Sequence, residues 1–154
     1  MPPHHQQFSD HYYGRIETIV EKILDEAEEE LFEMGVPVKT RHKEVAPNQF
    51  EFCSLFEDAG NAIDHNILKL EVLKEVCDKY GYVPLYHEKP FSKINGSGKH
   101  VNWSLNYLFG NKMRNLFSPD SSSDELFLLF TLIKLKAVLN NQKLYLSSVS
   151  CPGN

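Results

Sequence analysis

The chain has 154 residues and a formal net charge of −5. This length is enough to bury one core, and we interpret the chain as one domain. Lysine and arginine are scattered, so the composition indicates neither a nucleic-acid nor a membrane-surface partner. The three cysteines lie far apart without a CxxC pair, which favours buried thiols in a reducing compartment over a zinc site. These features predict a soluble, cytoplasmic protein.

The first half of the chain has the pattern of two helices around a hairpin. Residues 1–9 lack the apolar core of a secretory signal, and we expect them to form a disordered tail. Apolar residues then recur at three- and four-residue steps from about 13 to 34, which predicts a helix. A hairpin is predicted over 36–55. A second helix should follow from 57 or 58 to about 80, with a buried apolar stripe along its whole length.

Glycines should end both helices, at Gly35 and Gly81. After the second helix, residues 82–87 have the alternation of a third strand. Residues 108–123 are predicted to be a loop. A last long helix should run from 125 to 139, capped by Asp124 or a neighbouring serine. Its apolar residues nearly surround it, which predicts deep burial or burial against a missing partner. Residues 144–149 can extend a helix or form a final strand.

The predicted hairpin carries two carboxylates, Glu44 and Glu51. If Pro47-Asn48 forms a two-residue turn, these two residues lie directly opposite each other on one face. Like charges in such a position destabilise a hairpin, and a divalent cation bound between them would remove the repulsion. The alternative is two solvated glutamates in another register. His42 shares this face, either as a group supporting the site or as a plain polar strand residue.

A second stretch, residues 95–104, joins a glycine-rich turn to an alternating segment. Gly96 and Gly98 allow the backbone to approach a ligand closely or to adopt a positive φ. The segment after them is predicted to be a strand on which His100, Asn102 and Ser104 share one face. That face can line a site, or the stretch can be a plain hairpin with a polar exposed surface.

Taken together, these stretches resemble a known family. Glu44-Val-Ala-Pro-Asn-Gln-Phe-Glu51 resembles the Glu-Val-x-Pro-x-Gln-x-Glu element of glutamine synthetases, and Lys89-Pro90 followed by Asn95-Gly-Ser-Gly-Lys-His100 resembles the Lys-Pro and Asn-Gly-Ser-Gly-x-His elements. The residues around these elements are most similar to those of the type III branch. The resemblance runs from about residue 10 to the end. It implies that 10–154 is part of a catalytic domain truncated at both ends, with the α+β fold shared with guanidino kinases, in which helices pack on antiparallel strands.

The resemblance also implies a reaction in which ATP, glutamate and ammonia are the substrates. The γ-carboxylate of glutamate attacks the γ-phosphate of ATP, and ammonia then displaces phosphate from γ-glutamyl phosphate, with Mg²⁺ or Mn²⁺ neutralising the developing charge. The implied roles are metal binding by Glu44, Glu51 and His100, glutamate binding by Asn95 and Gly96, and nucleotide binding by Asn102 and Ser104. Many members have histidine in place of Asn102. Lys89 would balance nearby carboxylates or fix the end of a strand. Asp64-His65 resembles a pair in the family; the alternative is local hydrogen bonding within the helix, and we assign the pair no catalytic role.

In the family the active site forms between subunits of a homo-oligomeric ring, and an arginine-bearing segment and an N-terminal domain complete it. The isolated 154-residue chain is therefore expected to be inactive. The alternative function is a non-catalytic interaction protein derived from a glutamine synthetase. A guanidino phosphotransferase is disfavoured, because those enzymes lack the Asn-Gly-Ser-Gly-x-His element.

Overall fold

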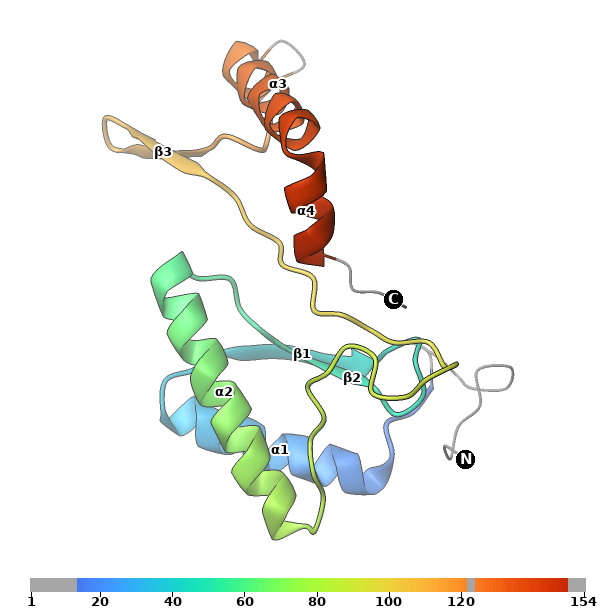
Figure 1. Ribbon diagram of the computed structural model, residues 1–154. Coiled ribbons are helices and arrows are strands. Elements are labelled where there is room, and N and C mark those ends of the chain that lie inside the picture. The colour runs from blue at the N-terminus through green and yellow to red at the C-terminus, as the bar shows by residue number, and fades with distance from the viewer. Residues whose placement is uncertain (1–13, 122–123, 150–154) are drawn as a thin grey trace. The chain divides into compact units, whose positions relative to one another are not determined.

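The structure is a computed structural model that describes residues 14–121 and 124–149; the predicted tail at 1–9 lies outside them. The chain forms two compact units, divided between Lys99 and His100. The described part contains four helices and two separate two-stranded antiparallel sheets (Figure 1). The predicted α+β class is thus confirmed.

The two helices of the first unit end as expected from their glycines. Helix α1 spans Thr18–Glu33, beginning later than predicted, and α2 spans Ala59–Lys79. After α1, Gly35 has φ 80° and the Val36 N–H donates to the Leu31 carbonyl at 2.8 Å. This is a Schellman motif, which satisfies carbonyls that the helix end leaves unpaired. Gly81, with φ 74°, closes α2 in the same way.

The core of the first unit lies where α1 and α2 pack together beneath the hairpin (Figure 1). The buried stripe predicted along all of α2 is present only in its second half, because Ile63 and Ile67 in the first half are 61% and 52% exposed. The core residues come from both helices and from the chain just after α1, and are Ile23, Ala27, Leu31, Val36, Val72, Val76 and Cys77.

Strands β1 (Val38–Lys43) and β2 (Phe50–Ser54) form the hairpin. Phe52 packs against the core, and Arg41, its direct partner across the sheet, forms ion pairs with Asp25 and Glu28 of α1. Lys43 is buried and its Nζ donates to the Glu17 carboxylate at 3.2 Å. Since strand side chains alternate between faces, this side of the hairpin faces α1, and His42 and Glu51 lie on the other side.

The chain after α2 does not form the strand predicted over 82–87, nor the strand predicted after the glycine-rich turn at 95–98. Both segments are irregular, and no neighbouring strand pairs with them within the described ranges. Tyr86 instead anchors the first segment, donating its hydroxyl to the Leu70 carbonyl at 2.7 Å. Burial raises the pKa of Tyr86 to about 12. Both strand predictions, which rested on alternation alone, are therefore wrong, because a strand also needs a neighbouring strand for its backbone hydrogen bonds.

In the second unit, the loop predicted over 108–123 is wrong for its first part. Strands β3 (Asn106–Phe109) and β4 (Lys112–Asn115) pair as a tight hairpin. Gly110 and Asn111 form its two-residue turn, in which Gly110 has φ 58°. Gly-Asn between two strand-like runs is a hairpin signal, and the sequence interpretation did not use it.

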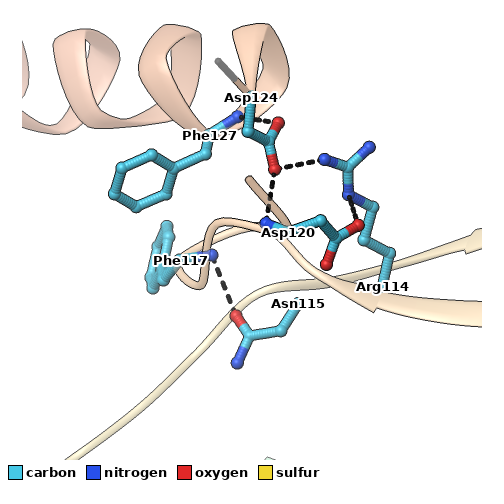
Figure 2. A network of polar contacts seen from close by, with 6 residues as sticks. All are labelled: Arg114, Asn115, Phe117, Asp120, Asp124 and Phe127. Atoms are coloured by element: carbon cyan, nitrogen blue, oxygen red, sulfur yellow. Dashed lines mark hydrogen bonds and ion pairs between the residues drawn. The ribbon is translucent and has the colours of Figure 1, made fainter. Parts of the chain in front are cut away.

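The long helix predicted over 125–139 is confirmed, and residues 144–149, for which a helix and a final strand were both considered, are helical. Helix α3 spans Glu125–Asn140 and α4 spans Gln142–Val149. Asp124 caps α3 by accepting a hydrogen bond from the Phe127 N–H at 3.0 Å, and its other carboxylate oxygen accepts from Arg114 and from the Asp120 N–H (Figure 2). None of the α3 residues is buried, so the deep burial offered as one alternative is wrong.

Among the described residues, no helix is both long and apolar enough to cross a membrane.

Candidate metal centre

The hairpin brings Glu44 and Glu51 onto one face, but in a different register from the predicted one. The turn Ala46-Pro47-Asn48-Gln49 forms as predicted, with a Gln49 N–H to Ala46 carbonyl bond at 3.3 Å and Asn48 at φ 57°. The Glu44 N–H, however, donates to the Gln49 carbonyl at 2.8 Å. The direct partner of Glu51 is therefore His42 rather than Glu44. A shift of two residues preserves the face, which is why both carboxylates still meet.

His42 lies between the two carboxylates. Its Nε2 is 3.1 Å from Glu44 Oε1 and 3.2 Å from Glu51 Oε2. One potential ligand atom from each of these three residues lies within 4.8 Å of the others. The side chains are partly sheltered, with exposed fractions of 35% for His42, 13% for Glu44 and 26% for Glu51. Two carboxylates and an imidazole form a donor set that fits a divalent cation such as Mn²⁺.

The other oxygen of each carboxylate is held by a neutral donor. The Ser97 hydroxyl donates to Glu44 Oε2 at 2.9 Å. The Cys53 thiol donates to Glu51 Oε1 at 2.9 Å. Burial first, and then the hydrogen bond with Glu51, raise the pKa of Cys53 to about 11. The thiol therefore stays protonated at neutral pH and remains a donor, which orients the carboxylate toward His42.

The glycine-rich turn packs against the segment that contains Glu88. The Ser97 N–H donates to the Glu88 carbonyl at 2.9 Å. Gly96 makes this approach possible, since a Cβ at that position would lie 2.2 Å from the Glu88 oxygen. Gly96 therefore allows two backbone segments to approach each other, a role that differs from the approach to a ligand and the positive φ considered for these glycines. The contact also positions Ser97 against Glu44, a link that the sequence interpretation did not assign.

The remaining predicted site residues are placed as follows. Asn95 is exposed beside Gly96 in the first unit. His100, Asn102 and Ser104 are exposed on an irregular segment that opens the second unit. The Lys89 N–H donates to His87 Nδ1 at 2.9 Å, and the two roles considered for its side chain stay predictions.

His65, noted for its resemblance to a family pair, contacts a carboxylate that precedes its own helix. Its Nδ1 lies 2.7 Å from a carboxylate oxygen of Glu57, just ahead of α2. Glu57 lies eight positions from His65 and outside α2, so this contact is not a hydrogen bond within the helix.

The fold and this cluster define an α+β protein with a candidate divalent-cation site on a hairpin. Comparison with known proteins identifies the family: residues 3–130 match the family described as glutamine synthetase, catalytic domain. The chain belongs to this family. It is 43% identical over 155 aligned residues to a type-3 glutamine synthetase of Dictyostelium discoideum, covering 99% of this chain and 21% of the relative.

Bacterial relatives give the same result. A glutamine synthetase of Bacteroides fragilis is 44% identical over 151 residues, covering 97% of this chain and 20% of the relative. One of Butyrivibrio fibrisolvens is 43% identical over 151 residues, covering 97% and 21%. The chain thus spans about a fifth of the length of the curated relatives it matches.

Proposed function

We propose that this chain contributes a cation-binding segment to an enzyme that ligates ammonia to glutamate at the expense of ATP. The observation that carries the proposal is the convergence of Glu44 and Glu51 on one hairpin face, with their nearest oxygens beside His42. Family membership supports the reaction. The alternative of a non-catalytic interaction protein does not require two partly buried carboxylates to lie together, so it leaves this arrangement unexplained.

In this proposal the hairpin would hold Mg²⁺ or Mn²⁺ through Glu44 and Glu51, and His100 would bind a second cation. A bound divalent cation would neutralise charge that develops during phosphoryl transfer. Asn95 and Gly96 would contact glutamate, and the pair Asn102 and Ser104 would contact the nucleotide. Ser97 would orient one carboxylate while its backbone holds the glutamate-binding turn in place. The same proposal includes assembly of the full-length enzyme into a homo-oligomeric ring.

Cation binding can be tested on the purified 154-residue chain with Mn²⁺ alone. Free aqueous Mn²⁺ gives a strong electron paramagnetic resonance signal that weakens on binding, so a titration yields Kd. Glu44→Gln and Glu51→Gln should each weaken binding roughly tenfold or more, because each removes a charged ligand. Glu29→Gln is the matched control, as it makes the same charge change on an exposed position of α1. Equal affinity in all four proteins would contradict the proposed site.

Activity is a separate test. Because the chain spans about a fifth of the length of its relatives, we expect no γ-glutamyl hydroxamate from glutamate, ATP and hydroxylamine with this polypeptide alone. Detectable product that depends on Glu44 would show that the segment is sufficient for catalysis and would overturn this expectation.

A further inference from the structure

The position of His42 goes beyond the role that the sequence suggested for it. It stands directly opposite Glu51 and two residues before Glu44, so all three side chains project from the same face of the hairpin. An imidazole placed between two carboxylates can either donate a hydrogen bond to them or share a cation with them. Here a single ring nitrogen, Nε2, contacts an oxygen of each at 3.1 and 3.2 Å.

These separations match those between neighbouring ligands of one cation. Two donor atoms at about 2.1 Å from a metal and at right angles to each other lie about 3.0 Å apart. The His42 nitrogen can therefore take a coordination position next to both carboxylate oxygens with only a small side-chain movement. The three potential ligand atoms lie within 4.8 Å of one another. Two ligands on opposite sides of one ion would be about 4.2 Å apart at this metal–ligand distance, so a small closing movement of the side chains would bring all three into range.

The outer hydrogen bonds support the same arrangement. Ser97 donates to Glu44 Oε2 and Cys53 donates to Glu51 Oε1, so each carboxylate already has one oxygen engaged. The oxygens that remain, Glu44 Oε1 and Glu51 Oε2, are those that converge on His42 Nε2. Neutral donors that hold the outer oxygens are how proteins commonly orient metal-binding carboxylates.

We propose that His42 is a direct ligand, through Nε2, of the cation held by Glu44 and Glu51. This inference rests on the proposed function, which requires a cation at the hairpin, and adds a nitrogen to its donor set. Imidazole binds Mn²⁺ in preference to Mg²⁺. His42→Gln should therefore weaken Mn²⁺ binding roughly tenfold to a hundredfold and weaken Mg²⁺ binding less, which reduces the preference of the site for Mn²⁺.

The direct test is pulsed electron paramagnetic resonance on the full chain with less than one equivalent of Mn²⁺. A coordinated imidazole nitrogen modulates the electron spin echo, and ¹⁵N-labelled histidine changes the modulation in a known way. We expect this modulation in the unsubstituted chain, and we expect it also in His100→Gln, which removes the other imidazole proposed to bind a metal. It should be lost in His42→Gln. The labelled, unsubstituted chain gives an answer that does not depend on a variant folding.

The possible results separate the two proposals. Binding of Mn²⁺ that depends on Glu51 but shows no histidine nitrogen would overturn ligation by His42 and leave the cation site intact; His42 would then only bridge the carboxylates. Modulation that persists in His42→Gln would overturn it as well. Binding that does not depend on Glu44 or Glu51 would instead overturn the proposed site itself.

Discussion

Replacing Gly96 with alanine tests how the glycine-rich turn is attached to the rest of the first unit. The added Cβ would lie 2.2 Å from the Glu88 carbonyl oxygen and 3.2 Å from the Lys89 Cα. All of these atoms belong to the backbone, so no side chain can rotate away. To reach an ordinary contact, one of the two segments must move by roughly 1 Å. Such a movement should break the 2.9 Å hydrogen bond from the Ser97 N–H to the Glu88 carbonyl.

The expected cost follows from these contacts. Overpacking costs about 1–3 kcal/mol, and the lost hydrogen bond costs about 1 kcal/mol more. Alanine also restricts the unfolded chain more than glycine does, which offsets this loss of stability by about 0.4–1 kcal/mol. The free energy of unfolding of Gly96→Ala should thus fall by about 2 kcal/mol. With a typical denaturant dependence, the urea midpoint should fall by about 1 M.

Gly98→Ala is the matched control. Its added Cβ would meet nothing closer than the Glu88 Cβ at 3.9 Å, so its stability should change by less than about 0.5 kcal/mol. Urea unfolding followed by circular dichroism measures both variants. Gly96→Ala should also weaken Mn²⁺ binding, because Ser97 would no longer hold Glu44. Equal urea midpoints for the two variants would refute the argument from close packing.

Two further predictions concern the core and the cap of α3. Leu31 is fully buried, whereas Phe32 is 79% exposed. In the same urea assay, Leu31→Ala should lower the free energy of unfolding by about 2–5 kcal/mol, and Phe32→Ala should lower it by less than about 0.5 kcal/mol. Hydrogen bonds from backbone N–H groups lower the pKa of Asp124 to about 2. The charged carboxylate therefore stabilises the folded state above about pH 4, and this stabilisation is lost as the pH falls toward 2. In Asp124→Asn, which keeps a capping oxygen, urea midpoints should depend less on pH in that window, whereas Asp120→Asn, on an exposed residue, should retain the dependence; identical profiles for all three proteins would contradict this assignment.

Local sequence determined much of the first unit. Gly35 and Gly81 predicted where α1 and α2 end, because only a residue that tolerates positive φ can close a Schellman motif at low cost. Pro47 and Asn48 likewise predicted the turn of the hairpin. These are signals that a few neighbouring residues carry by themselves.

The pairing within the hairpin depended on more than its turn. Glu51 lies opposite His42 because β1 and β2 are offset by two residues from the simplest register. On the helix-facing side of this register, Phe52 packs against the core, and Arg41 and Lys43 form ion pairs with acidic residues of α1 and its N-cap. The sequence nevertheless predicted the correct face for Glu44, since a shift of two residues keeps the alternation.

The sequence by itself indicated the family, the presence of α1, α2 and α3, the C-terminal ends of α1 and α2, and the two carboxylates of the candidate site, because motifs and periodicity are local properties of the chain. Only the tertiary structure decided that His42 lies between Glu44 and Glu51, that Ser97 holds one of these carboxylates, and that 82–87 is not a strand. Each of these depends on a partner distant in sequence or across a sheet. Such contacts form only when burial of the core has brought the segments together, and no local pattern encodes them.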